Sequence, residues 1–329
     1  MANQYADQDS PHILLVKTTS LGDVLHNLPV VSDIARHHPG AQIDWMVEES
    51  FAALPRLNPI VRNIIPVAVR RWRKSLFSAN TWCEIRALRA TLSWEKYDLC
   101  IDTQGLFKSA LLMRGANGIS CGFDKASARE PLAASMYQHT FSVAKGQHAV
   151  ERNRQLVAQV LGYTLEGPAD FGIKLPNVEK PDWLPDDDYA VLLHATSRAD
   201  KLWGEPGWLA LGHALHQKNI RCVLPWGSEA EKERSLRLAA QIPDAITPPK
   251  LSLDQAAALL GKARAVVGVD TGLAHLAAAV NVPTVGIYTA TNPTLTGLYA
   301  GPHTINLGNI DQSPDVQAVL DALRGMDAC

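Results

Sequence analysis

One segment of the sequence places polar side chains where a strand pattern gives way to a helix pattern. It is K-T-T-S-L-G-D-V-L-H-N-L-P at 17–29, where Thr19 and Ser20 offer hydroxyls and Gly22 allows a ligand close to the backbone. Asp23 stands at the expected helix start, where its carboxylate could accept the proton of an incoming hydroxyl as a general base. Capping is the commoner role of Asp at this position, and a helix N-terminus lowers carboxylate basicity. The residues alone leave both roles open.

A second segment has the same order of strand, polar turn and helix. It is A-V-V-G-V-D-T-G-L-A-H-L at 265–276. The free backbone N–H groups of Thr271 and Gly272 would point at an anion such as a pyrophosphate. Asp270 could orient sugar hydroxyls or cap the helix, and His275 one turn later is by default a packed histidine. The segment therefore predicts an anion site.

Two further strand ends are expected at the same edge of the second half. In H-A-T-S-R-A-D-K, Thr196 and Ser197 could bond phosphate oxygens, and Lys201 could neutralise charge on a leaving nucleoside diphosphate. Alternatively, Lys201 is a solvated loop lysine. In P-W-G-S-E-A-E, Glu231 could hold ribose hydroxyls or be an ordinary acid in a first helical turn. Together the three strand ends predict a nucleotide-sugar site.

A local excess of positive charge lies in the first half. Between Phe51 and Cys83 there are six basic residues and no acid, and R-R-W-R-K at 70–74 is the centre of this run. Arginines suit phosphates and carboxylates, and an anionic membrane leaflet attracts basic segments. A solvated loop and a nucleic-acid site are the alternatives, but the net charge of -2 and the absence of a nucleic-acid motif disfavour the latter. Further basic side chains could extend an anion site: Lys108, Arg129, His148, Arg152 and Arg154.

Strand patterns alternate with helix patterns along the whole chain. Strand candidates in the first half are 12–17, 42–47, 60–69, 98–103 and 117–123, and the first helix has an apolar face of Leu25, Leu28, Ile34 and Ala35. After residue 188 come Y-A-V-L-L-H, I-R-C-V-L-P, A-V-V-G-V-D and P-T-V-G-I-Y, with helices near 206–217, 228–241, 253–261 and 271–280. This alternation predicts an α/β protein with parallel sheets covered on both faces.

The chain is expected to form two domains. A proline-rich, acidic segment at 167–188 is a predicted linker between domains at 12–166 and 189–312, after a polar extension at 1–11. The last stretch, 313–329, is a predicted helix that packs back on the N-terminal domain. Two such domains bind ligands at the carboxyl ends of their strands, facing each other across a cleft.

Composition excludes several classes of protein. Five scattered cysteines without C-x-x-C fit reduced thiols better than disulfides or zinc, and no signal peptide or run of 18 apolar residues is present. A soluble intracellular protein is expected. No metal motif, G-x-G-x-x-G or P-loop sequence occurs, which counts against a dehydrogenase or a P-loop kinase.

The motifs resemble those of the lipopolysaccharide heptosyltransferases of glycosyltransferase family 9, especially heptosyltransferase I, which adds the first heptose. Besides the segments above, the resemblance is carried in order by I-P-V-A-V-R-R-W-R-K, I-D-T-Q-G-L-F-K-S-A, A-R-E-P-L-A, H-A-V-E-R-N-R, L-P-W-G and P-K-L-S-L. It implies a GT-B fold of two Rossmann-like domains. It also implies inverting transfer of L-glycero-D-manno-heptose from ADP-heptose to Kdo2-lipid A, without a metal or other cofactor.

The resemblance also assigns roles to residues. Asp23 becomes the base and Lys201 stabilises the leaving ADP. The expected donor-binding residues are Thr196, Ser197, Lys201, Glu231, Leu251, Asp270, Thr271, Gly272 and His275. The expected acceptor-binding residues are Thr19, Ser20, Gly22, Arg70, Arg71, Arg73, Lys74, Gln104, Lys108 and Arg129.

The resemblance further implies a cytoplasmic monomer, peripheral on the inner membrane, with no nucleic-acid partner. Three other functions stay open at this point. The first is the sister enzyme that adds the second heptose. The second is a sugar-nucleotide epimerase or hydrolase of the same fold. The third is a non-enzymatic nucleotide-sugar-binding protein docked on membrane through R-R-W-R-K.

Overall fold

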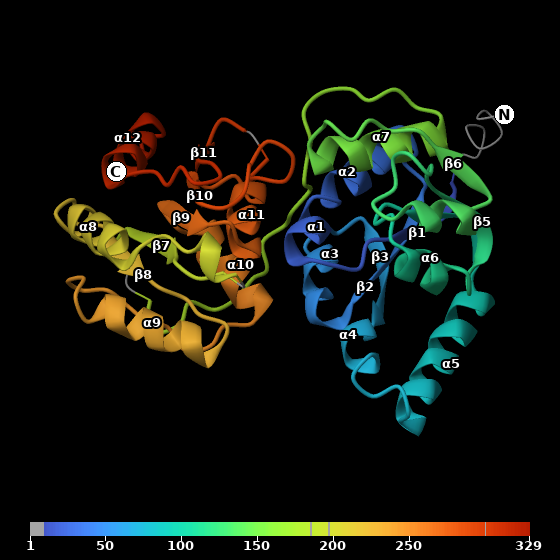
Figure 1. The fold of residues 1–329 in the computed structure, drawn as a ribbon, viewed down its shortest axis with the longest axis horizontal. Coiled ribbons are helices and arrows are strands. Elements are labelled where there is room, and N and C mark those ends of the chain that lie inside the picture. Colours follow the sequence, from blue (N-terminus) through green and yellow to red (C-terminus); the bar gives the residue numbers. More distant parts are fainter. Residues whose placement is uncertain (1–9, 185, 197, 300) are drawn as a thin grey trace. The chain divides into compact units, whose positions relative to one another are not determined.

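The computed structural model describes residues 10–184, 186–196, 198–299 and 301–329, and the chain divides into two compact units (Figure 1). The first unit is Met1–Lys174 and the second is Leu175–Cys329. The division falls inside the segment 167–188, where the described residues form neither helix nor strand. Each unit is described by itself below.

A parallel six-stranded sheet forms the centre of the first unit. Its order is β3-β2-β1-β4-β5-β6. The central strand β1 (His12–Val16) has no solvent exposure from Ile13 onward, as expected for a strand covered on both faces. The other strands are β2 (Gln42–Glu48), β3 (Val61–Val67), β4 (Lys96–Asp102), β5 (Asn117–Phe123) and β6 (His139–Phe141). The short β6 carries too few residues for its pattern to have predicted it.

The first predicted helix is divided in two. The structure has α1 (Leu21–Leu25) and α2 (Leu28–His37), because Pro29 is suited to the first turn of a new helix. Leu25, Leu28 and Ile34 are fully buried, as the apolar face predicted. The remaining helices of this unit are α3 (Ala53–Arg56), α4 (Val69–Trp72), α5 (Ala79–Trp94), α6 (Phe107–Met113) and α7 (Ala149–Leu161).

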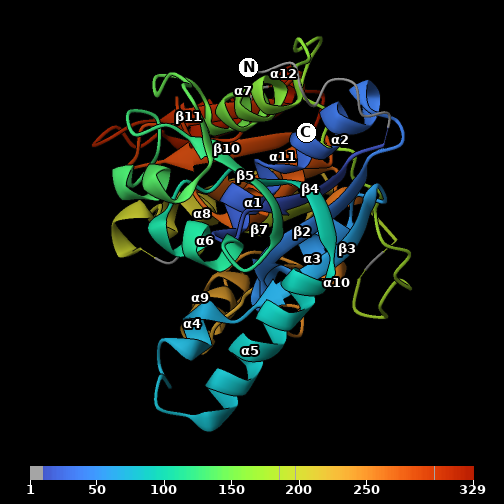
Figure 2. The same cartoon turned by 90° about the vertical axis from the view of Figure 1, so that its right-hand side faces the viewer.

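A helical hairpin projects from the first unit. Figures 1 and 2 both show α5 extending away from the sheet, with α4 beside it and the loop that joins them at the far end. Along α5 only Thr81 and Leu92 are buried. Core packing therefore accounts for little of the length of this helix.

The second unit contains a parallel five-stranded sheet of order β11-β10-β9-β7-β8. Its strands are β7 (Tyr189–Leu193), β8 (Arg221–Val223), β9 (Ala265–Val269), β10 (Thr284–Tyr288) and β11 (Thr304–Gly308). Its helices are α8 (Glu205–His216), α9 (Glu229–Ala239), α10 (Leu253–Gly261), α11 (Gly272–Ala279) and α12 (Val316–Gly325). The strand β11, only partly buried throughout, was not predicted. In both units the α/β class is confirmed.

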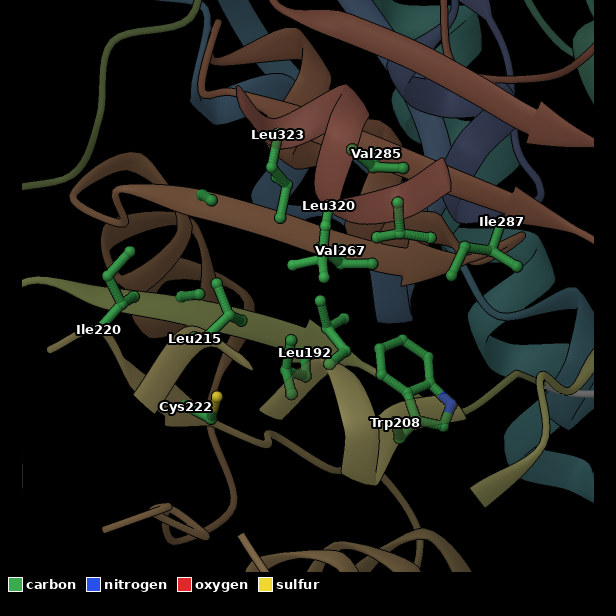
Figure 3. Packing of buried hydrophobic residues seen from close by; sticks show 14 of the residues in the cluster. Leu192, Trp208, Leu215, Ile220, Cys222, Val267, Val285, Ile287, Leu320 and Leu323 are labelled. Carbon is green, nitrogen blue, oxygen red and sulfur yellow. The ribbon is translucent and has the colours of Figure 1, made fainter. Parts of the chain in front are cut away.

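The last helix packs on the second unit. Val319 and Leu323 of α12 lie in the core of that unit with Trp208 and Leu192, as Figure 3 shows for Leu323, Trp208 and Leu192. The helix buries its apolar face there because α8 and β10 provide a matching apolar surface. The expected contact of residues 313–329 with the N-terminal domain stays a prediction. Within the described residues, no helix is long and apolar enough to cross a membrane.

Candidate functional site

Asp23 lies in the first turn of α1, directly after the carboxyl end of β1. Its Oδ2 accepts hydrogen bonds from the backbone N–H of Ser20 (2.8 Å) and from the Ser20 hydroxyl (3.1 Å). The guanidinium of Arg129 lies 3.9 Å from the same oxygen. Asp23 therefore caps α1 through Oδ2, while Oδ1 has no hydrogen bond in the described part of the chain and is the atom on which a base function would depend.

The loop before α1 is held by residues that follow β4. The side-chain oxygen of Gln104 accepts the backbone N–H groups of Thr18 (3.0 Å) and Thr19 (3.1 Å). Lys108 donates to the Thr19 hydroxyl at 3.4 Å. The structure thus brings together seven of the predicted acceptor or catalytic residues at the edge where β1 and β4 end: Thr19, Ser20, Gly22, Asp23, Gln104, Lys108 and Arg129.

Asp102, at the end of β4, holds the residues of this edge in place through hydrogen bonds. The sequence analysis did not predict this role. Its Oδ1 accepts the backbone N–H of Gln104 at 2.7 Å, and its Oδ2 accepts the hydroxyls of Ser109 (2.7 Å) and Tyr137 (2.8 Å). Burial raises the pKa of Asp102, against the opposing effect of these hydrogen bonds. Asp102 fixes the position of Gln104 and, through it, the loop that leads to Asp23.

Lys17 is a second residue of this edge that sequence reasoning missed. It is buried directly after β1, and its Nζ donates to the backbone oxygen of Thr103 (2.7 Å) and to Asn153 Oδ1 (3.3 Å). The side-chain amide of Asn153 in turn donates to the backbone oxygen of His26, just after α1. Lys17 thereby connects β1, β4, α7 and the end of α1.

The basic segment 70–74 has mixed roles. Arg71 was expected to contact an acceptor, but its guanidinium pairs with Glu49 (3.1 Å) and Glu84 (2.9 Å). These ion pairs link α4 to α5 and to Glu49, and the contact of Arg71 with an acceptor stays a prediction. Arg73 and Lys74 are exposed and form no ion pair within the described residues.

Arg70 connects the basic segment to the end of β2. Its backbone N–H donates to Glu48 Oε1 (3.0 Å), and its guanidinium lies 4.9 Å from the centre of the Phe51 ring. The backbone N–H of Glu48 donates to the backbone oxygen of Thr18 at 3.2 Å. Arg70 therefore lies at the same edge of the sheet as Asp23.

The basic residues at the start of α7 make contacts within the first unit. Arg154 is buried and binds both carboxylate oxygens of Asp33, at 2.7 and 3.1 Å. Arg152 donates to the backbone oxygen of Ser127 at 2.6 Å, and the His148 ring accepts the backbone N–H of Val150 at the start of α7. These contacts stabilise the first unit. Arg154 is buried in its pair with Asp33, whereas a contact of His148 or Arg152 with an anion stays a prediction.

In the second unit, Asp270 is the centre of a polar cluster at the carboxyl end of β9. Its Oδ2 accepts the ammonium of Lys201 (2.5 Å) and the hydroxyl of Thr291 (3.0 Å). The Nε2 of His275 lies 3.8 Å from Oδ1, and the Thr196 hydroxyl donates to the backbone oxygen of Asp270. Burial alone would raise the pKa of Asp270, but His275 and Lys201 together hold it well below its usual range. The Asp270 carboxyl group is therefore ionised at neutral pH.

The helix that follows this cluster is suited to an anion. Thr271 is the N-cap of α11 and makes no side-chain capping bond, so the first backbone N–H groups of α11 lack intrahelical acceptors. Gly272 opens the helix without a side chain that would block access. Of the predicted donor residues, Thr196, Lys201, Asp270, Thr271, Gly272 and His275 come together here. Thr291 joins them although sequence reasoning missed it, and Ser197 lies outside the described residues.

Glu231 and Leu251 lie on other loops of the second unit. The Oε2 of Glu231 accepts the backbone N–H groups of Gly227 (2.7 Å) and Ser228 (3.2 Å), so in this structure it caps α9. Leu251 precedes α10 and lines a cavity of about 300 Å³ with Trp183 and Leu259. The described residues that line this cavity do not include Glu231 or any member of the Asp270 cluster. Their roles in binding a nucleoside stay predictions.

Comparison with known proteins decides the family. A model of glycosyltransferase family 9 (heptosyltransferase) matches residues 85–322, which is more than half of the chain. The chain belongs to this family. A relative from Pseudomonas aeruginosa, lipopolysaccharide heptosyltransferase 1, is 48% identical over 300 residues, which cover 90% of this chain and 83% of the relative.

Two solved structures of the Escherichia coli heptosyltransferase WaaC extend the similarity over both units. The structure with ADP has a TM-score of 0.88 and 42% identity, and covers 96% of this chain and 99% of WaaC. The structure with ADP-2-deoxy-2-fluoro heptose has a TM-score of 0.86 and 41% identity, and covers 95% and 99%. The predicted family, the heptosyltransferase class and the GT-B fold of two Rossmann-like domains are thus confirmed.

The buried lysine of this family 9 member gives a prediction about stability. Burial lowers the pKa of Lys17 to about 8, although the carboxylates of Asp23 and Asp102 oppose the shift. Between about pH 8 and 10.5 the unfolded chain retains a proton that folded Lys17 has released, so folding becomes more favourable as the pH rises. Below about pH 8 the full cost of burying the charge is present.

We expect Lys17→Met to remove this pH dependence. The free energy of unfolding of the unsubstituted protein, minus that of the variant, should increase between pH 7.5 and 10 by on the order of 2–3 kcal/mol. Urea unfolding at several pH values measures it, and Lys108→Met, which removes an amine from the surface of the same edge, is the control. Parallel pH profiles for the unsubstituted protein and Lys17→Met would show that Lys17 is solvated in solution.

Proposed function

We propose that this chain transfers L-glycero-D-manno-heptose from ADP-heptose to Kdo2-lipid A, as an inverting enzyme that requires no metal. The high identity to proteins named lipopolysaccharide heptosyltransferase 1, extending over both units, supports this assignment. The observation that carries it is the Asp270 cluster, with Lys201 and the open N-terminus of α11 beside it. Such a cluster suits a sugar joined to a diphosphate.

The donor half of the proposal uses the second unit. The ammonium of Lys201 and the first N–H groups of α11 bind the diphosphate, while Asp270, held by Thr291 and His275, accepts hydrogen bonds from heptose hydroxyls. Glu231 binds the ribose hydroxyls, and the backbone of Leu251 contacts adenine. Charge develops on the diphosphate as the sugar departs, so fixed donors at this place stabilise the transition state more than the bound substrate.

The acceptor half uses the first unit. Asp23 takes the proton of the acceptor hydroxyl, whose oxygen forms a bond to the anomeric carbon from the face opposite ADP. The bond between that carbon and the β-phosphate oxygen breaks, and ADP leaves with the electron pair. Arg70, Arg71, Arg73 and Lys74 bind the phosphates and carboxylates of the acceptor. We propose further that the protein is a monomer, peripheral on the cytoplasmic face of the inner membrane.

The test is ADP release from ADP-heptose, measured in the presence of a chelator, with and without Kdo2-lipid A. Release that requires the acceptor supports the transferase. Acceptor-independent consumption would favour an epimerase or hydrolase, and binding without turnover would favour a nucleotide-sugar-binding protein. Transfer onto an acceptor that already carries one heptose, but not onto Kdo2-lipid A, would identify the enzyme that adds the second heptose.

Among the described residues there is no group of three His, Cys, Asp or Glu side chains that could hold a metal ion.

A further inference from the structure

Three large apolar side chains are exposed together at the end of the α4–α5 hairpin. Leu76 is 53% exposed and Trp82 is 52% exposed, while Phe77 between them is wholly exposed. The indole N–H of Trp82 donates to the backbone oxygen of Leu76 at 2.9 Å, which fixes the ring against the loop. Figures 1 and 2 show this loop at the far end of the hairpin. We call these three residues the hairpin tip.

The hairpin tip has no evident purpose within the first unit. An exposed Phe or Leu contributes nothing to folding through burial, and grouped apolar side chains on a surface mark an interaction site. The anchoring contacts of the hairpin lie behind the tip: Trp72 is buried and donates to Glu84 at 2.6 Å, and Arg71 pairs with the same carboxylate. The hairpin is thus braced immediately behind the tip and apolar at its end.

Positive charge surrounds the hairpin tip. Residues 70–94 contain six basic side chains and one acid, Glu84, which gives a net charge of +5. The single acid is already engaged by Arg71 and Trp72. The exposed cations that no ion pair neutralises within the described residues are Arg70, Arg73, Lys74, Arg86 and Arg89.

We propose that the hairpin tip inserts Leu76, Phe77 and Trp82 into a lipid surface that carries anionic headgroups. The charges explain attraction to such a surface, but an acidic soluble partner would not need three apolar side chains at the end of a projecting hairpin. Apolar anchors combined with flanking cations, and an indole with one polar edge, are the features that fit the boundary between headgroups and acyl chains. The proposal rests on the proposed function in one respect, because a lipid-linked acceptor would lie in that same surface.

Binding to vesicles tests the proposal. We expect the protein to co-sediment with vesicles of phosphatidylethanolamine and phosphatidylglycerol (7:3) and not with phosphatidylcholine vesicles. Leu76→Asp and Phe77→Asp should each weaken binding by about tenfold or more, because they place a carboxylate at the acyl boundary. The matched control is Leu236→Asp on α9, whose leucine is 51% exposed and should be neutral. Equal binding by the tip variants and the unsubstituted protein would overturn the proposal.

A second measurement reports which part of the hairpin inserts. Brominated lipids quench an indole that enters the acyl region, so quenching should be lost in Trp82→Phe. It should persist in Trp94→Phe, although Trp94 is 87% exposed, because that residue lies about 18 Å further along α5. Loss of quenching only in Trp94→Phe would contradict insertion of the tip. If heparin retains the protein and its Phe77→Asp variant equally, and neither binds vesicles, the surface is purely ionic and the proposal is wrong.

Turnover separates this proposal from the proposed function. With a deacylated, water-soluble acceptor, Leu76→Asp and Phe77→Asp should react as fast as the unsubstituted protein. With the acceptor embedded in vesicles they should be about tenfold slower at low lipid concentration, in proportion to their weaker binding. If no acceptor is used at all, the proposed function fails. The vesicle-binding measurements then still test insertion of the hairpin tip, because they do not depend on turnover. Equal loss on both acceptors would place the tip in acceptor binding rather than in membrane contact.

Discussion

Replacing Asp23 with asparagine is expected to reduce turnover by about 100- to 10,000-fold while ADP affinity and folding stay unchanged. The amide keeps an oxygen that can accept the Ser20 N–H, now 2.8 Å from Oδ2, so the cap of α1 is preserved. What the substitution removes is the capacity to accept a proton. Steady-state kinetics on the acceptor and calorimetric titration with ADP measure the two quantities separately.

Asp23→Ala is the matched variant for the cap. It should lose turnover to the same extent and, in addition, about 1 kcal/mol of stability, because the Ser20 N–H loses its acceptor. Normal turnover in Asp23→Asn combined with destabilised Asp23→Ala would show that Asp23 only caps the helix. A loss of ADP affinity in a folded Asp23→Asn protein would also show that the residue has been given the wrong role.

The sequence predicted the sheet edges well because they depend on local patterns. A buried apolar run followed by hydroxyls, Gly22 and Asp23 marks the carboxyl end of a strand whatever the remainder of the chain does. The same holds for the run that ends at Asp270. Parallel strands then bring such ends to one edge, so the neighbours Thr19 and Gln104, far apart in the chain, could be expected to meet.

The partners of individual charges could not be predicted in this way. Nothing local to R-R-W-R-K reveals that Arg71 faces Glu49 and Glu84, because those acids lie on separate elements. Arg154 was likewise considered for an anion site, but the packing of α7 beside α2 pairs it with Asp33, 121 residues earlier in the chain. Which cations remain available to a ligand is set by tertiary packing.

Buried polar residues were missed for a related reason. Lys17 begins a motif whose hydroxyls and acid attracted the functional interpretation, and a lysine is ordinarily expected in solvent. Its partners are a backbone oxygen after β4 and Asn153 on α7, so only the assembled unit satisfies its amine. Thr291 likewise enters the second cluster from a loop after β10 that carries no motif.

Replacing Lys201 with methionine is expected to weaken ADP binding and lower kcat by about 100- to 1000-fold, because the ammonium stabilises the leaving diphosphate. In the present structure this ammonium is held by Asp270 at 2.5 Å. The two residues could therefore act as one unit, with Lys201 serving only to orient Asp270. Asp270→Asn distinguishes the two arrangements, since it leaves Lys201 in place but removes the carboxylate that competes with phosphate for it.

If Lys201 binds the diphosphate directly, Asp270→Asn should bind ADP at least as tightly as the unsubstituted protein, while its turnover falls because the heptose is no longer oriented. The double variant Lys201→Met/Asp270→Asn should then bind ADP as weakly as Lys201→Met alone, because the second change has no ammonium left to release. Isothermal titration with ADP, with a chelator present, gives the four affinities. An Asp270→Asn variant that loses ADP affinity as severely as Lys201→Met would show that the two residues act as one unit. Lys201 would then serve to orient Asp270 and would have no separate role in stabilising the leaving group.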